Sequence, residues 1–225
     1  CQYLVWGCFI TDGHDVEHKR NYMSLLRKRK IIVEEIKDEV ARSFTDEKIF
    51  YVDSKDQKVN LILAYLNIEP LKLLEKRNKI VNLFLARHFN AEVQQILSRD
   101  IDPYIRIEVV KHSPESIAKG MLNDENEGVR LALLRRFHNE DVSIYLSDPS
   151  EMVRMEAVKF ADIEKIKDFI NDPSQYVRLA LAERNNSEIC GKLINDDYYK
   201  IRAHIAKIDI DDFSFVLMKD KELYV

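Results

Sequence analysis

The chain has 225 residues, of which 46% are hydrophobic, and carries a net charge of −4. Its five glycines leave little room for sheets joined by tight turns, and the small negative charge disfavours a general nucleic-acid binder, which usually carries a basic excess. No apolar run approaches the ~20 residues of a membrane span, and no secretory signal pattern is visible.

Residues 1–53 do not follow the periodic pattern that governs the rest of the chain. Apolar side chains keep helical spacing over residues 15–44, which predicts one long or two broken amphipathic helices. The end repeats of stacked repeat proteins are atypical. We therefore expect residues 1–53 to form an N-terminal cap over the first repeat.

Two motifs in this segment suggest sharper functions. His14 and His18 fit the H-x-x-E-H pattern of inverted zinc peptidases, but no third ligand or catalytic domain can be identified, and a solvated helix start is the simpler interpretation. The basic stretch 18–30 could contact phosphates. The acidic block at 34–39 follows it directly, and pairing along a helix accounts for much of both.

From residue 54 onwards the chain repeats itself. Complete units begin near residues 54, 76, 100, 124, 148, 172 and 196, and a partial unit begins at 220. From residue 100 the period is a strict 24 residues, which predicts a stacked helical repeat. In the two upstream copies, Val59–Ala64 and Val81–Ala86, asparagine replaces the arginine found later.

Two charged columns mark the 24-residue units. Each unit starts with an aspartate, and an arginine preceded by a β-branched residue follows six positions later: Asp100, Arg106, Asp124, Arg130, Asp148, Arg154, Asp172, Arg178, Asp196 and Arg202. The aspartate is predicted to cap the N-terminus of a helix of about three turns. The arginine projects between apolar positions, so we predict an Asp–Arg ladder within or between repeats rather than a phosphate site.

Each unit ends with a short apolar pair such as Phe169-Ile170 or Leu193-Ile194. The remaining residues allow only a short helix or a 3₁₀ turn. Cys190 falls at the place of Ala118, Val142 and Ile166, so we predict a small core residue rather than a reactive thiol. Three unclustered cysteines favour a reducing, cytoplasmic location.

The Asp-Pro-x-x-x-Val-Arg-x-x-Ala pattern with a period of 24 resembles the leucine-rich repeat variant family, a relative of HEAT-like repeats. The resemblance covers residues 54–225 and implies a right-handed all-α solenoid in which α-helices alternate with short 3₁₀-like helices. The type member also carries an iron–sulphur cluster on N-terminal cysteines. This chain has only Cys1 and Cys8 there, and such a cluster takes four thiolates, so we expect no cofactor and no metal.

A helical projection predicts three solvent-facing columns on the main helices, while Val177, Leu179, Leu181 and their equivalents are assigned to the core. One column is unusually apolar and contains Tyr104, Met152 and Tyr176. The second is small or acidic, with Glu108, Ala132, Glu156 and Ala180. The third is basic, with Lys111, Arg135, Lys159 and Lys207. The apolar and basic columns form the candidate partner surface, because tyrosine is enriched at binding surfaces.

These features predict an all-α solenoid that acts as a non-catalytic scaffold for a protein or peptide partner. The alternative is a nucleic-acid-binding HEAT-like repeat protein, of the kind used in DNA repair or defence, that would use the basic column and residues 18–30. Helical-repeat glycosylases need aromatic and carboxylate groups at the lesion, and the repeats offer no acid–base pair. Trp6, the single tryptophan, lies outside them.

Overall fold

The structure is a computed structural model that describes residues 57–65, 69–87, 90–208, 220 and 222. It divides the chain into two compact units, residues 1–88 and 89–225. All regular elements among the described residues are helices, as the repeat pattern predicts. The expected boundary between the cap and the repeats at residue 53 lies outside the described residues, as do the motifs at 14–18 and 18–30.

The first unit contains α2 (Gln57–Tyr65), α3 (Pro70–Glu75) and α4 (Lys79–Leu85). The two upstream copies of the repeat form α2 and α4, and the asparagines that replace arginine, Asn60 and Asn82, are buried. Asn60 Oδ1 accepts a hydrogen bond from Lys76 Nζ at 2.8 Å. Lys76 is the first residue of its repeat, where later units have aspartate. In this pair the first residue of a repeat is the donor and the residue six positions into the preceding repeat is the acceptor, the reverse of the later repeats.

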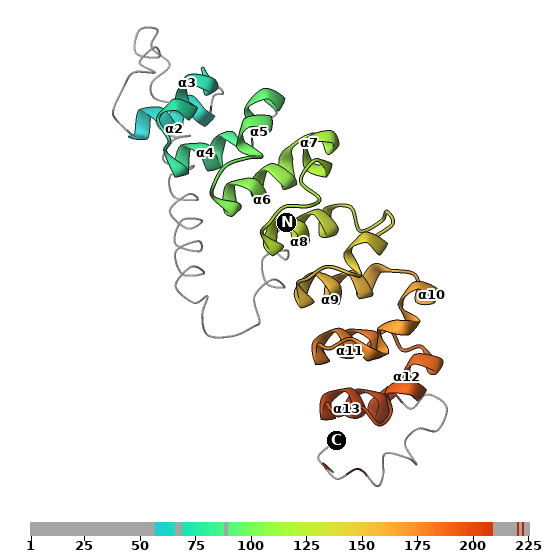
Figure 1. Ribbon diagram of the computed structural model, residues 1–225. Helices are drawn as coiled ribbons and strands as arrows, with labels where there is room; N and C mark the ends of the chain where they lie inside the picture. Colours follow the sequence, from blue (N-terminus) through green and yellow to red (C-terminus); the bar gives the residue numbers. More distant parts are fainter. Residues whose placement is uncertain (1–56, 66–68, 88–89, 209–219, 221, 223–225) are drawn as a thin grey trace. The chain divides into compact units, whose positions relative to one another are not determined.

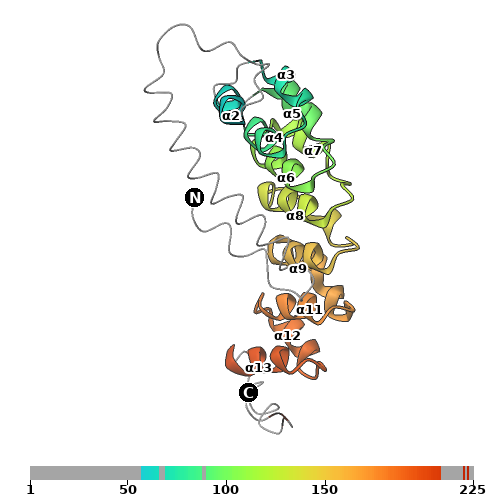
Figure 2. The ribbon, with the colours of Figure 1, turned by 90° about the vertical axis from the view of Figure 1, so that its left-hand side faces the viewer.

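The second unit is a row of similar helices, as in an α-solenoid (Figures 1 and 2). The long helix of each repeat lies beside the next, and the shorter helices lie on the other side of the row (Figure 1). The long helices are α6 (Pro103–His112), α8 (Glu127–Arg136), α9 (Glu151–Phe160), α11 (Gln175–Ala182) and α13 (Tyr199–Ile208). The short elements are α5 (Ala91–Leu97), α7 (Glu115–Lys119), η1 (Ser143–Tyr145), α10 (Ile163–Ile166), η2 (Lys167–Asn171) and α12 (Ser187–Leu193).

The core of this unit lies between the long and the short helices. The β-branched residue that precedes each column arginine is fully or almost fully buried in all five repeats. Cys190 is also fully buried, and burial raises the pKa of its thiol. A buried thiol with a raised pKa is a poor nucleophile, which agrees with its predicted role in the core.

The helices begin two residues later than the sequence predicted. The N-caps are Asp102, Asn126, Ser150 and Ser174, and not the column aspartates. Asp124 Oδ1 instead accepts from the backbone N–H of Asn126 at 2.9 Å, and the other column aspartates do the same two residues ahead. This is an Asx turn, so the aspartate shapes the approach to the helix and keeps its second oxygen available.

The column aspartate and the column arginine of the preceding repeat form the ladder that joins neighbouring repeats. Arg130 donates from Nε and Nη2 to both carboxylate oxygens of Asp148, at 2.7 and 2.8 Å. Its Nη1 donates to the backbone carbonyl of Asp124 in its own repeat at 2.7 Å. Equivalent side-chain pairs are Arg106–Asp124, Arg154–Asp172, Arg178–Asp196 and Arg202–Asp220.

In this ladder, Nε, Nη1 and Nη2 of the column arginine all donate hydrogen bonds to acceptors of the protein, as in Arg130. The hydrogen bond to the aspartate raises the pKa of every column arginine. Bidentate pairs of this kind are geometrically specific as well as strong. The ladder therefore fixes the spacing between repeats and leaves these arginines unsuited to phosphate recognition.

A second set of arginines, not predicted from the sequence, occurs in alternate repeats and joins each to the repeat before it, at the other end of the long helices. Arg184 Nη1 donates to the carbonyls of Val158 and Ala161, at 2.5 and 2.8 Å. Arg136 makes the equivalent bonds to the carbonyls of Val110 and Ser113. The last carbonyls of a helix have no intrahelical partner, so these guanidiniums satisfy the C-terminal ends of α9 and α6.

We expect Arg184→Ala to lower the free energy of unfolding by about 1.5–3 kcal/mol, the range for hydrogen bonds to a charged group. Urea unfolding followed by far-UV circular dichroism would measure the change. Arg99→Ala, at an exposed site after α5, is the matched control and should change stability by less than about 0.5 kcal/mol. Equal effects in the two variants would contradict the capping role.

Candidate functional site

The exposed side of the long helices in the second unit, called here the long-helix face, differs from the predicted one. The predicted small or acidic column does not face solvent: Glu108 is 1% exposed, Glu156 is 7% exposed and Ala180 is 2% exposed. Ala132 is half-buried. The reason is the neighbouring helix, since Arg135 of α8 reaches across to Glu156 of α9. This column therefore lies in the contact between adjacent long helices.

The residues that do face outwards form an apolar column that the sequence analysis assigned to the core. Ile107, Met155, Leu179 and Ala203 are half-buried, and Leu131, at the same place in its repeat, is 7% exposed. Gly128 lies against this column, where a Cβ would meet Cδ1 of Ile107 in ordinary contact at 3.4 Å and Oδ1 of the N-cap Asn126 more closely, at 3.0 Å. Apolar side chains thus cover the middle of the long-helix face.

The predicted column of Tyr104, Met152 and Tyr176 lies beside this apolar column. Tyr176 is 36% exposed, while Tyr104 and Met152 are half-buried. Together the two columns form a row of apolar side chains, called here the apolar strip: Tyr104, Ile107, Leu131, Met152, Met155, Tyr176 and Leu179. On α8 the row is interrupted, because Gly128 has no side chain and Leu131 is only 7% exposed. Large apolar areas left on a protein surface mark interaction sites more often than scattered apolar residues do.

An aromatic cluster extends the apolar strip onto α13. The rings of Tyr176 and Tyr198 meet edge to face with centroids 6.2 Å apart, and those of Tyr198 and Tyr199 are 5.7 Å apart. Lys200 Nζ lies 5.8 Å from the centroid of the Tyr198 ring. Tyr198 stands at the N-cap place that holds Asp, Asn or Ser in earlier repeats, and this exception is the signal by which the sequence could have revealed the cluster.

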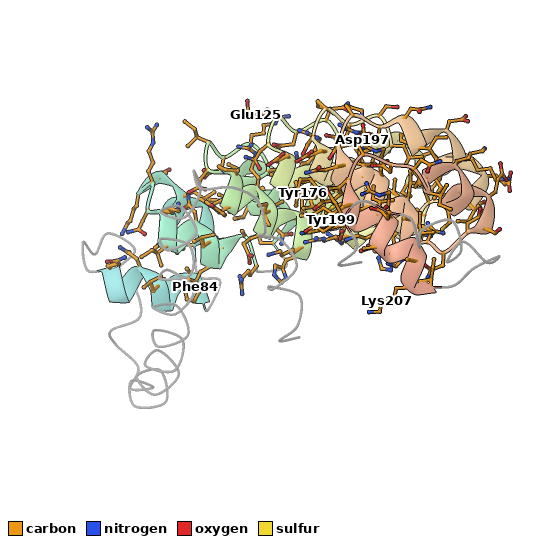
Figure 3. All side chains as sticks on the ribbon, turned by 90° about the horizontal axis from the view of Figure 1, so that it is seen from below. Phe84, Glu125, Tyr176, Asp197, Tyr199 and Lys207 are labelled. Carbon is orange, nitrogen blue, oxygen red and sulfur yellow. The ribbon has the colours of Figure 1, made fainter. Side chains whose placement is uncertain are left out.

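Charged residues of opposite sign lie at the two ends of the long helices. Carboxylates gather at the N-terminal ends of the long helices and form the acidic edge: Glu125, Glu127, Glu151 and Asp197. The predicted basic column lies at the C-terminal ends and forms the basic edge: Lys111, Arg135, Lys159 and Lys207. Figure 3 shows Glu125 and Asp197 on one side of the tyrosines and Lys207 on the other. Glu183 interrupts the basic edge on α11.

Three cations of the basic edge form ion pairs with the buried glutamates Glu108 and Glu156. Arg135 Nε donates to Glu156 Oε1 at 2.5 Å, and Lys159 Nζ donates to Glu156 Oε2 at 3.0 Å. Lys111 pairs in the same way with Glu108 at 2.9 Å. Lys207 is exposed and forms no ion pair with a described residue. Three of the four cations on this edge are therefore paired within the protein.

This pairing gives Glu156 a role in pH-dependent stability. Burial alone would raise the pKa of Glu156, but hydrogen bonds from Arg135 and Lys159 outweigh burial and lower it. A carboxylate with a lower pKa in the folded than in the unfolded chain stabilises the fold above the unfolded value, near 4.3. That stabilisation is lost as the pH falls through the folded value.

We therefore expect Glu156→Gln to be less stable than the unchanged protein at pH 7, and the difference to shrink as the pH falls from about 5 to about 3. Urea unfolding at a series of pH values would measure the difference. Glu164→Gln, at an exposed site on α10 where Glu164 pairs with Lys167, should show a much smaller difference, since exposed ion pairs contribute little. A Glu156→Gln deficit that is constant over this range would show that the charge of Glu156 does not contribute.

Among the described residues, no group of three or more His, Cys, Asp and Glu side chains is arranged to hold a metal ion. The candidate ligands His14, His18, Cys1 and Cys8 lie outside the described residues. Within residues 57–65, 69–87 and 90–208, no helix is both long enough and apolar enough to cross a membrane.

Comparison with solved structures supports the repeat architecture. The chain is similar to a leucine-rich repeat variant described as having a novel repetitive structural motif, with a TM-score of 0.61 and 18% sequence identity over 76% of this chain and 79% of the other. A likeness at this level of identity shows the fold, a solenoid of short helical repeats, and not the function. No protein-family model and no curated protein matches the sequence.

Proposed function

We propose that the protein is a non-catalytic scaffold that binds a protein or peptide partner on its long-helix face. The observation that supports this function best is the apolar strip, which runs along consecutive repeats between two charged edges. Tyr104, Met152 and Tyr176 would supply apolar contact area. Lys111, Arg135, Lys159 and Lys207 would form part of the polar rim that surrounds the core of most interfaces.

The repeat architecture suits this function. Each repeat contacts its neighbours along the row, and the ladder fixes their spacing, so the strip is held at a constant geometry before a partner arrives. Solenoids commonly use such extended surfaces for binding. Little conformational entropy would be lost on the scaffold side, which favours affinity.

Nucleic-acid binding is the alternative function, carried by the basic edge and residues 18–30. The pairing of Lys111, Arg135 and Lys159 with buried glutamates weighs against it, because these cations would have to leave existing partners to reach a phosphate. We expect weak or no binding to duplex DNA at physiological salt. Sub-micromolar affinity with a steep salt dependence, reduced in Arg135→Ala and Lys159→Ala, would favour this alternative over the scaffold.

We expect Tyr176→Ala to weaken binding of the partner by about 1–2 kcal/mol, or more if Tyr176 is a hot spot. Tyrosine is enriched among hot-spot residues of interfaces. The tagged protein and the variant would be compared in affinity purification from the source organism with quantitative mass spectrometry. The fold should be little affected, since Tyr176 is 36% exposed.

Ile144→Ala is the matched control for this experiment. Ile144 is 63% exposed on η1, on the short-helix side of the row. A partner that is depleted by Tyr176→Ala and retained by Ile144→Ala would support the proposed face. A partner lost only with Ile144→Ala, or a Tyr176→Ala variant whose main defect is a lower melting temperature, would refute it.

A further inference from the structure

We propose that the partner segment that binds the long-helix face is cationic and amphipathic, with its apolar side chains on the apolar strip and its lysines or arginines against the acidic edge. This inference rests on the proposed function and adds the chemistry of the partner to it. It follows from a difference between the two charged edges of the strip.

The carboxylates of the acidic edge have weaker cationic partners within the protein than Glu108 and Glu156 have. Within the described part of the chain, Glu127, Glu151 and Asp197 form no ion pair. Glu127 Oε2 accepts a hydrogen bond from Ser150 Oγ, and column arginines interact electrostatically with all three carboxylates. These arginines are already engaged: Arg154 donates to Asp172 and to two backbone carbonyls. Glu125 has only a 3.5 Å contact with Arg106, whose stronger partner is Asp124.

On the basic edge, in contrast, Lys111, Arg135 and Lys159 are already paired with Glu108 or Glu156. An anionic partner would compete with the pairs that Glu156 makes with Arg135 and Lys159, at 2.5 and 3.0 Å. A cationic partner would meet carboxylates whose neighbouring cations, the column arginines, already bind the column aspartates. Charge complementarity therefore selects a basic segment, because juxtaposed like charges are costly at an interface.

The aromatic cluster supports the same choice. Tyr176 and Tyr199 are 36% and 44% exposed, and Asp197 lies next to Tyr198 in the sequence. Exposed aromatic rings beside a carboxylate suit the side chains of arginine and lysine, which are attracted to the face of a ring. The protein already contains one such contact, between Lys200 and the ring of Tyr198.

The length of the strip sets the size of the partner segment. The strip crosses four neighbouring long helices, from α6 to α11, and packed helices lie about 8–10 Å apart. It therefore extends over about 24–30 Å, which an α-helix covers with about 16–20 residues. An amphipathic helix of that length presents one apolar stripe and can place its charged residues on the side of the acidic edge.

Three synthetic 18-residue peptides test this inference by fluorescence anisotropy in 150 mM NaCl. The first carries leucine and lysine at helical spacing, the second replaces every lysine with glutamate, and the third replaces every leucine with serine. We expect the leucine–lysine peptide to bind, and the other two to bind at least tenfold more weakly. The combined variant Glu127→Gln, Glu151→Gln and Asp197→Asn should weaken binding of the first peptide about tenfold, since it removes three exposed carboxylates that each contribute modestly to a charge pair.

A second combined variant controls for the overall change in charge. Asp162→Asn, Glu164→Gln and Asp168→Asn remove three exposed carboxylates from α10, its N-cap and η2, on the short-helix side. This variant should bind the leucine–lysine peptide within twofold of the unchanged protein. Equal weakening by the two combined variants would indicate a general charge effect and overturn the inference.

The remaining outcomes separate this inference from the proposed function. If the leucine–glutamate peptide binds more tightly than the leucine–lysine peptide and Leu179→Ala weakens it, the long-helix face binds partners but the inferred charge is wrong. If the serine–lysine peptide binds as tightly as the leucine–lysine peptide, the apolar strip is not used and both proposals fail. Both also fail if no peptide binds.

Discussion

Arg130→Ala is expected to lower the free energy of unfolding by about 3–5 kcal/mol, the range for removing one partner of a buried ion pair. Arg130 is 9% exposed and its partner Asp148 is 8% exposed. The substitution leaves the Asp148 carboxylate buried with a backbone N–H of Ser150 but without its cation. It also leaves the carbonyl of Asp124 without the guanidinium. Urea unfolding at pH 7 would measure the loss.

A matched variant on the same helix separates the ladder from other ion pairs. Arg135→Ala removes one partner of Glu156, but Lys159 still holds that carboxylate, so the expected loss is about 1.5 kcal/mol. Replacing both members of the ladder pair, Arg130→Met with Asp148→Leu, should be less destabilising than Arg130→Ala alone, because no buried charge remains unpaired. If Arg130→Ala has an effect below about 1 kcal/mol, the ladder is not a major source of stability.

The period and the composition of the repeat were sufficient to predict the helices and the buried β-branched column. The start of each helix was misplaced by two residues because aspartate is favoured both in Asx turns and at N-caps. Asp148 makes the turn and Ser150 occupies the cap position. The sequence left open whether the ladder lies within or between repeats. Only the stacking of the helices shows that Arg130 spans to the next aspartate and also bonds to its own repeat.

The outward face was harder to predict, because a projection of one helix does not show which flanks its neighbours cover. Glu156 and Leu179 illustrate the error, since a glutamate is normally assigned to solvent and a leucine to the core. In the stack, Glu156 lies between adjacent helices with Arg135, and Leu179 faces outwards. The capping arginines Arg136 and Arg184 were missed for a different reason. They are 48 residues apart, and Phe160 stands at the equivalent place of the repeat between them, so an alignment of every 24-residue unit shows no arginine column there.

Two leucines on α11, two residues apart, provide a direct test of this reassignment. Leu181 is fully buried and Leu179 is half-buried on the apolar strip. We expect Leu181→Ala to lower the free energy of unfolding by about 2–5 kcal/mol, because it leaves a cavity in the core that the surrounding helices fill only partly. Leu179→Ala should cost about 1 kcal/mol or less, since it removes methyl groups that are partly in contact with water.

The two variants should have the opposite order of effects on binding. At a temperature where both are folded, Leu181→Ala should bind a partner of the long-helix face within about twofold of the unchanged protein, because its side chain does not reach the surface. Leu179→Ala should bind several-fold more weakly, since it removes apolar contact area from the strip at about 25 cal/mol per Å². Melting temperatures and binding isotherms measured on the same preparations would give both comparisons. If Leu179→Ala is as destabilising as Leu181→Ala and leaves binding unchanged, Leu179 belongs to the core and the binding surface lies elsewhere.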